Sequence, residues 1–130
     1  MILVDSSVWI DYFNGRSTVA TDRLDDLLSH ELLLTGDIIL AEVLQGFRRQ
    51  SDFRRARSLF DKLEYRDMLG RDVAIAAATN YRKLRARGVT VRKTIDVMIA
   101  TFCIRNGHRL LHSDRDFTPM ERHLKLKTVL

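Results

Sequence analysis

The sequence predicts an α/β fold in which a central parallel sheet of about five strands lies between two layers of helices. Short apolar runs, suited to strands buried on both faces, alternate with longer segments of helical periodicity. This alternation is typical of βαβ units, whose right-handed crossovers put helices on both faces of one sheet. The 130 residues suffice for one hydrophobic core, so we expect a single domain over residues 1–130.

The first half of the chain predicts two strands and three or four short helices. Residues 1–4 form an apolar run that ends at an acid, as expected for a buried strand. Ser6 or Ser7 can cap a helix over residues 8–13, which Asn14-Gly15 ends. A helix over residues 19–29 and a strand over residues 32–34 follow. The next helix opens after Thr35-Gly36-Asp37 and is expected to bury Ile39, Leu40, Val43, Leu44 and Phe47. A further helix runs from Ser51 or Asp52 to about residue 63.

The second half predicts two helices between short strands. An alanine-rich helix over residues 71–87 ends at Gly88, and Thr94 can cap an apolar helix over residues 95–105. The other expected elements are a strand within residues 65–69, a strand over 109–111, a short helix over 119–123 and a last strand over 127–129.

The composition excludes a membrane-spanning protein and points to the cytoplasm. No run of about 18 apolar residues is present, and the N-terminal residues do not resemble a signal peptide. A lone Cys103 in an apolar helical pattern is expected to be a buried, unreactive thiol in a reducing compartment.

The formal charge of +5 allows two interpretations. The excess of Lys and Arg is compatible with an ordinary basic surface or with binding to a polyanion, since cations provide most nonspecific affinity for nucleic acids. Basic residues gather in two stretches, 48–57 and 82–93, which favours the second interpretation. Charge alone does not decide between them.

Five acidic side chains are predicted to gather at one edge of the sheet. Asp5 follows the first strand, and Asp114 and Asp116 follow the strand over residues 109–111. Asp96 begins the helix that leads into that strand, and Glu42 lies beside the apolar stripe of an earlier helix. Taken singly, each acid has a simpler explanation as a helix cap, a turn residue or a solvated rim residue. Taken together, they fall at the carboxyl ends of parallel strands, where such folds place their sites.

Clustered carboxylates repel one another unless cations neutralise them, so the cluster predicts a metal site. Oxygen ligands without His or Cys favour Mg²⁺, with Mn²⁺ able to substitute, over zinc. An acidic, metal-binding cleft in a basic protein suggests hydrolysis of phosphodiester bonds by a metal-activated water.

Four segments resemble the PIN-domain ribonucleases, and specifically the VapC toxins of bacterial toxin–antitoxin pairs. They are MILVDSSVWIDYF at the start, LAEVLQGF around Glu42, TIDVMIA around Asp96 and LLHSDRDF near the end, in the family's order and at nearly its usual spacing. The resemblance covers essentially the whole chain and implies a PIN-like α/β/α sandwich.

The resemblance implies roles for individual residues. It carries over Asp5, Glu42, Asp96 and Asp114 as catalytic, metal-coordinating acids. Asp116 matches an acidic position that family members use variably, so its loss is expected to matter less than that of Asp114. Two hydroxyl residues match supporting positions of the family, Ser7 beside the first acid and Thr94 before the third. The cap of the following helix is an equally good explanation of Thr94.

The resemblance also implies partners. The substrate would be RNA, often a loop of transfer or ribosomal RNA, and the toxin would form a homodimer that a cognate VapB-type antitoxin inhibits. Arg92 and Lys93, just before the third acid, are the candidates for contacts with RNA phosphates. His112 is expected near the site without being a ligand, and the aromatic residues Trp9, Tyr12 and Phe13 are expected in the core or in a groove for the antitoxin.

Other classes fit the sequence less well. An aspartyl-phosphate phosphatase would need a second acid at position 7, which is Ser7, and a receiver domain would need a lysine late in the sheet. A non-catalytic relative that binds RNA or protein would be expected to lack some of the acids. A DNA nuclease of the wider fold would be expected to carry inserted loops.

Overall fold

The computed structural model describes all residues from Met1 to Leu130 and shows the predicted parallel sheet. Its four strands lie in the order β3-β2-β1-β4, and every pairing is parallel. Their bounds are β1 (Ile2–Val4), β2 (Leu34–Gly36), β3 (Glu64–Arg66) and β4 (Arg109–Leu111). The α/β fold class is therefore confirmed, with four strands in place of about five.

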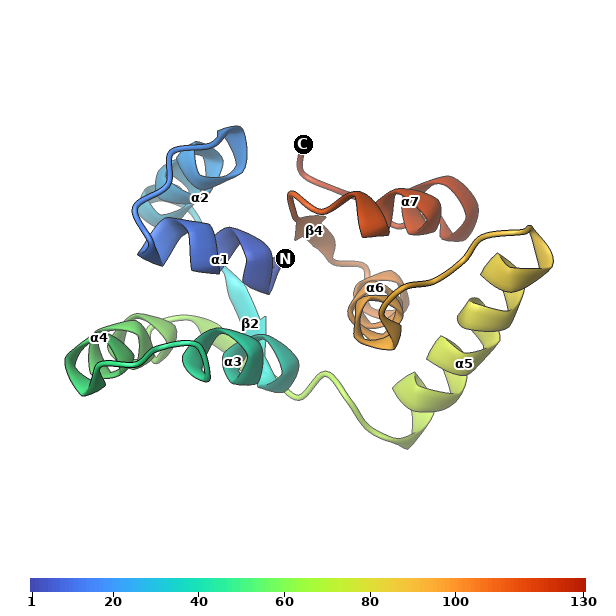
Figure 1. The fold of residues 1–130 in the computed structure, drawn as a ribbon, viewed down its shortest axis with the longest axis horizontal. Helices are drawn as coiled ribbons and strands as arrows, with labels where there is room; N and C mark the ends of the chain where they lie inside the picture. Colours follow the sequence, from blue (N-terminus) through green and yellow to red (C-terminus); the bar gives the residue numbers. More distant parts are fainter.

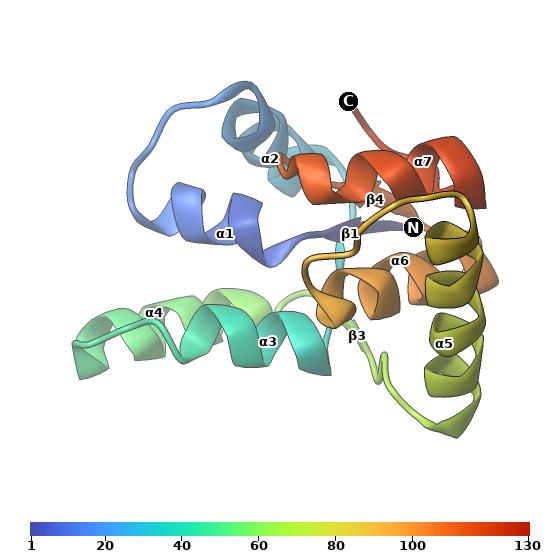
Figure 2. The same ribbon diagram turned by 45° about the vertical axis from the view of Figure 1, so that its right-hand side comes forward.

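Helices cover both faces of this sheet. They are α1 (Ser6–Phe13), α2 (Val19–His30), α3 (Asp37–Leu44), α4 (Gln50–Phe60), α5 (Arg71–Ala86), α6 (Thr94–Asn106) and α7 (Thr118–Leu124), with a 3₁₀ turn η1 (Arg115–Phe117). Figure 1 shows α1 to α4 on one side of the strands and α5 to α7 on the other. In Figure 2, α5 stands across α6 and α7, with which it is in contact. No helix is long and apolar enough to cross a membrane.

The residues of β1 and β2 and most of β4 lie in the middle of the core, whereas β3 at the sheet edge is largely exposed. All three residues of β1 are buried, as are Leu110 and Leu111 of β4. The two strands pair in register from Ile2 to Val4. Since β1 and β4 are neighbours and run in the same direction, the residues that follow them emerge side by side at one edge.

Several element boundaries differ from the sequence-based expectation: β2 spans Leu34–Gly36 in place of residues 32–34, and α4 ends at Phe60 in place of about residue 63. The strand β3 begins at Glu64 because its residues pair with β2, from Leu34↔Glu64 onward. Helix α3 ends at Leu44, so Phe47 packs on the core from the following turn. The segment expected as a fifth strand, residues 127–129, contributes only one parallel bridge, between Leu110 and Thr128.

Gly36, at the junction of β2 and α3, is required by a close approach of the chain. A Cβ atom at this position would overlap the Met68 side chain and the Arg66 carbonyl oxygen. The next residue, Asp37, accepts a hydrogen bond of 2.7 Å from the Met68 N–H and so fixes the end of β3 against the start of α3. This junction also sets the direction in which α3 leaves the sheet.

The substitution Gly36→Ala is expected to destabilise the protein by about 1–3 kcal/mol, because the added methyl group forces backbone and Met68 apart. Urea unfolding followed by circular dichroism measures the change. Gly46→Ala is the matched control, since a Cβ there meets its nearest neighbour at an ordinary 3.5 Å. Equal stability of the Gly36 and Gly46 variants would contradict the close approach.

Candidate active site

Asp5 lies directly beyond β1, and its position is fixed by the first turn of α1. Its carboxylate caps this helix by accepting hydrogen bonds from the backbone N–H of Ser7, at 3.2 Å, and from the Ser7 hydroxyl. The Asp5 N–H in turn donates to the Leu111 carbonyl oxygen at 2.9 Å, which ties Asp5 to the end of β4. Ser7 thus supports Asp5, as the sequence led us to expect.

Glu42 reaches the same edge from α3. Its Oε1 accepts a hydrogen bond of 3.0 Å from the Ser6 hydroxyl, so two successive serines orient two different acids. Sequence analysis treated Ser6 only as a possible helix cap. The signal for its role was the pair of adjacent serines after Asp5, but the pairing with a residue 36 positions away is a tertiary contact.

Asp96, Asp114 and Asp116 form a compact group, which we call the acidic trio. Each offers one carboxylate oxygen to a cluster in which these atoms lie within 4.8 Å of one another. Asp96 is buried in the first turn of α6. Asp114 accepts a hydrogen bond of 2.9 Å from the Asp116 N–H and so caps η1, which turns Asp116 back toward Asp96. The acid that the sequence ranked last thus belongs to the tightest part of the site.

Burial makes Asp5 and Glu42, the two acids outside the acidic trio, harder to ionise. It raises the pKa of Asp5, although the hydrogen bonds from Ser7 and the nearby His112 act in the opposite direction. It also raises the pKa of Glu42, against the hydrogen bond from the Ser6 hydroxyl and with a further contribution from the charge of Asp5.

Within the trio, the acids differ in how easily they ionise. Burial raises the pKa of Asp96 from 3.8 to about 6, with Lys93 acting against it and the neighbouring acids adding to it. The pKa of Asp114 is lowered instead. Desolvation opposes ionisation there, but the Asp116 N–H and the Lys93 ammonium outweigh it.

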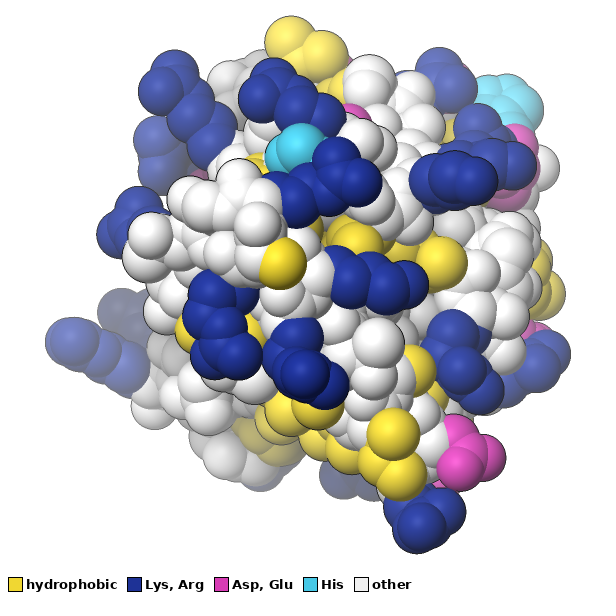
Figure 3. Space-filling view, turned by 90° about the vertical axis from the view of Figure 1, so that its right-hand side faces the viewer, with side chains coloured by type: hydrophobic (Ala, Val, Ile, Leu, Met, Phe, Trp, Pro, Cys, Tyr) yellow, Lys and Arg dark blue, Asp and Glu magenta, His cyan; other side chains and the backbone are white.

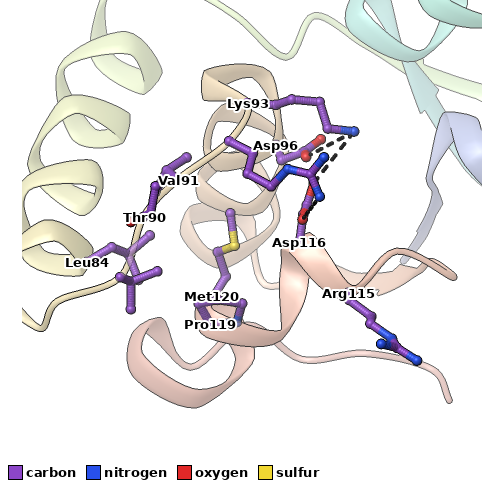
Figure 4. A pocket seen from close by; sticks show the side chains of 11 residues that line it. Leu84, Thr90, Val91, Lys93, Asp96, Arg115, Asp116, Pro119 and Met120 are labelled. Atoms are coloured by element: carbon purple, nitrogen blue, oxygen red, sulfur yellow. Dashed lines mark ion pairs between the residues drawn. The ribbon is translucent and has the colours of Figure 1, made fainter.

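Lys93 and Arg92, predicted to contact RNA, both point at the acids. Figure 4 shows the Lys93 ammonium over Asp96 and Asp116, with dashed lines marking the ion pairs. Its Nζ lies 3.3 Å from Asp114 Oδ2, 3.5 Å from Asp96 Oδ2 and 3.8 Å from Asp116 Oδ2. One guanidinium nitrogen of Arg92 lies 3.9 Å from Asp116 Oδ1. Burial opposes the charge on Lys93, but these carboxylates outweigh it and raise its pKa.

Thr94 has neither of its expected roles in the structure. Lys93 takes the position that caps α6, and no side chain caps this helix. The Thr94 side chain lines an apolar depression between α5 and α6, together with Ala77, Tyr81 and Met98. The hydroxyl that supports Asp96 in the resemblance is therefore directed elsewhere.

His112 braces the turn that carries Asp114. Its Nδ1 lies 3.2 Å from the Asp114 N–H, which donates to it, and its Nε2 faces Glu121 Oε2 at 3.4 Å. Glu121 also accepts a hydrogen bond of 3.0 Å from the Thr128 hydroxyl. This series of contacts connects the turn after β4 to α7 and to the C-terminal segment, and it places His112 beside the acid-bearing turn.

The donor set fits a hard divalent cation. All five acids offer oxygen only, and no His or Cys belongs to the cluster. Asp96 Oδ2 is buried and accepts no hydrogen bond, and its only charged partner is the Lys93 ammonium at 3.5 Å. The trio is the group whose oxygens lie close enough together to hold such an ion, and Asp5 and Glu42 lie near enough to affect the charge of the site.

Comparisons with known proteins identify the family and the fold of the chain. The family model described as PIN domain matches residues 2–122. Ribonuclease VapC11 of Mycobacterium tuberculosis is 35% identical over 132 aligned residues, which cover 98% of this chain and 96% of the relative. A VapC ribonuclease of Mycobacterium bovis matches equally well.

Solved structures share the fold at low sequence identity. VapBC2 from Rickettsia felis, bound to a promoter DNA fragment, superposes with a TM-score of 0.76 at 17% identity, over 99% of this chain and 98% of that one. VapBC from Salmonella typhimurium gives 0.73 at 17% identity, with 98% and 96% covered. VapC20 from Mycobacterium tuberculosis, a Sarcin-Ricin loop cleaving toxin, gives 0.66 at 15% identity, with 91% and 93% covered.

The raised pKa of Asp96 predicts that the metal-free protein is less stable when this acid ionises. Because the folded-state pKa of about 6 exceeds the ordinary 3.8, the contribution of Asp96 to stability falls as pH rises between these values. Asp96→Asn is therefore expected to raise the free energy of unfolding at pH 7.5 in EDTA by about 1–3 kcal/mol.

Urea unfolding of the two proteins at pH 4 and pH 7.5 measures this difference, with Asp25→Asn on the exposed side of α2 as the control. An Asp96→Asn protein that is no more stable than the wild type at pH 7.5 would show that Lys93 fully compensates the buried charge.

Proposed function

Since the chain belongs to the PIN-domain family and, within it, to the VapC ribonucleases, we propose that it is a metal-dependent endoribonuclease toxin of a type II toxin–antitoxin system. The observation that carries the proposal is the compact cluster of Asp96, Asp114 and Asp116, with Asp5 and Glu42 close enough to affect the ionisation of neighbouring acids, in a protein of net charge +5. The reaction is hydrolysis of RNA phosphodiester bonds.

The acids would hold Mg²⁺, with Mn²⁺ as an alternative. Asp96, Asp114 and Asp116 would supply ligands from one compact cluster, and Asp5 and Glu42 would add further carboxylate oxygens. A bound ion would supply the Lewis acid that activates the attacking water and stabilises charge on the leaving oxygen. Ser6 and Ser7 orient the two outer carboxylates through their hydroxyl hydrogen bonds. Such fixed orientation is what pre-organises a site for reaction.

Cations beside the acids support RNA as the substrate. Arg92 and Lys93 line the small pocket that opens from Asp96 and Asp116 toward α7, and Arg115 lies at its edge with its guanidinium pointing away from the acids (Figure 4). Figure 3 shows the face of the molecule on the side of α5 and α7, where Lys and Arg side chains are spread widely and acidic ones are few. A phosphate backbone lying on this face would be led toward the acids.

An antitoxin of the VapB type is the proposed inhibitor. An apolar depression on α1 and α3 is lined by Ile10, Phe13, Val43 and Phe47. A neighbouring one includes Ile38, Leu69, Ile95 and Glu42 itself, so that a helix bound there would contact the active site. Trp9, by contrast, is fully buried in the core and takes no part in this groove. VapBC complexes among the similar structures support this partner.

The proposal extends to target and assembly. We expect the substrate to be a loop of transfer or ribosomal RNA, because one similar structure is that of a toxin described as cleaving the Sarcin-Ricin loop. Such RNAs are cytoplasmic, which places the activity in the cytoplasm. As in the resemblance, the toxin is expected to be a homodimer, which light scattering of the purified protein tests.

Loss of one trio acid is expected to abolish cleavage. Asp96→Asn removes a negative ligand, and a loss of a few kcal/mol of transition-state stabilisation corresponds to a rate lower by about 100-fold or more. The assay incubates purified protein with total cellular RNA and Mg²⁺, then maps new 5′ ends, with EDTA and Asp25→Asn as controls. Cleavage by Asp96→Asn at the wild-type rate would refute the mechanism.

The position of Asp116 in the acidic trio changes the effect that its substitution is expected to have on RNA cleavage. Because Asp116 offers an oxygen to the same compact cluster as Asp114, we expect Asp116→Asn and Asp114→Asn to lower cleavage to a similar extent. The same 5′-end assay compares them. A much smaller loss for Asp116→Asn would instead favour the sequence-based ranking, in which Asp116 is the variable member.

A further inference from the structure

Lys93 occupies a special place relative to the acidic trio. Its ammonium group is within 3.3–3.8 Å of one oxygen from each of the three acids and donates a hydrogen bond to Asp114. The next cation, Arg92, reaches only Asp116, at 3.9 Å. Lys93 is therefore the one side chain that contacts the whole trio.

The contact with the Lys93 ammonium reduces the electrostatic repulsion between the three acids. Three carboxylate oxygens within 4.8 Å repel one another when ionised. An ammonium is a compact point charge with three donors, which suits it to three acceptors arranged around it. In this respect it takes the place of a small cation bound by the same oxygens.

We propose that the Lys93 ammonium is the built-in counter-cation of the metal-free trio, and that a divalent ion binds there by displacing it. The proposal rests on the proposed function, since it assumes that the acids bind metal. It adds a competitor, contained in the chain itself, that lowers the affinity of the site for the ion.

A divalent ion and the Lys93 ammonium cannot occupy the trio together, because they would need the same space and their like charges repel. A Mg²⁺ ion contacts its oxygen ligands at about 2.0–2.1 Å. An ion between the three trio oxygens would therefore lie where the ammonium now contacts them, and the two like charges would repel. The Lys93 side chain is 52% exposed and sits on the loop before α6, so rotation of its flexible stem frees the acids without moving the helix.

The displaced ammonium stays at the mouth of the site. Lys93 lines the pocket that also contains Arg92 and Arg115. Once released from the acids, its charge is available to a phosphate of the RNA. The same residue thus neutralises the trio before the ion binds and joins the phosphate-binding cations afterwards.

The test is the affinity for Mn²⁺ in the absence of RNA, measured by electron paramagnetic resonance of free Mn²⁺ or by calorimetry. Lys93→Met removes the competitor and is expected to bind Mn²⁺ about tenfold more tightly than the wild type, because three ion pairs between a half-exposed ammonium and the trio no longer oppose binding. Lys83→Met on α5 removes the same formal charge from an exposed lysine that has no ion pair, so it is expected to bind like the wild type.

The rise in melting temperature on adding Mn²⁺ gives a second readout and should be larger for Lys93→Met than for the wild type. Equal or weaker Mn²⁺ binding by Lys93→Met would overturn the proposal while leaving the metal site intact. Absence of Mn²⁺ binding by the wild type and by both variants would refute the proposed function, and this inference with it.

Discussion

Repulsion between carboxylates gathered at one edge of a small sheet is the constraint on which the rest of the structure depends. Asp5 and Asp114 come together because β1 and β4 are parallel neighbours with Val4 opposite Leu111. The first turn of α6 adds Asp96 to the same edge. No acid can move away to relieve the repulsion, since each is fixed by a strand end, a helix turn or a hydroxyl hydrogen bond. A cation close to these carboxylates therefore stabilises the ionised site.

The core supplies the stability that such a site costs. Its apolar cluster of 28 buried residues includes residues of all the strands but β3. Close approaches such as that at Gly36 fix the outgoing helices, and with them the carboxylates they carry. Buried acids with raised pKa values are typical of functional sites, where stability is given up for chemistry.

Sequence reasoning located the acids but not the contacts between them. The alternation of apolar runs and helices predicted the parallel sheet, and the rule that sites lie at the carboxyl ends of strands placed Asp5 and Asp114 together. The hydrogen bond from Ser6 to Glu42 and the brace from His112 to Asp114 depend on how distant segments meet or how a turn folds back. Spacing along the chain carries no information on such contacts. For the same reason Lys93 was assigned to RNA alone, although its side chain reaches back over three acids.

Anomalous X-ray diffraction from crystals soaked in Mn²⁺ tests the central claim most directly. The account predicts an anomalous peak among the carboxylate oxygens of Asp96, Asp114 and Asp116, with the Lys93 side chain turned away from them. A peak bound only elsewhere on the molecule, or Lys93 still seated on the acids at saturating Mn²⁺, would contradict it.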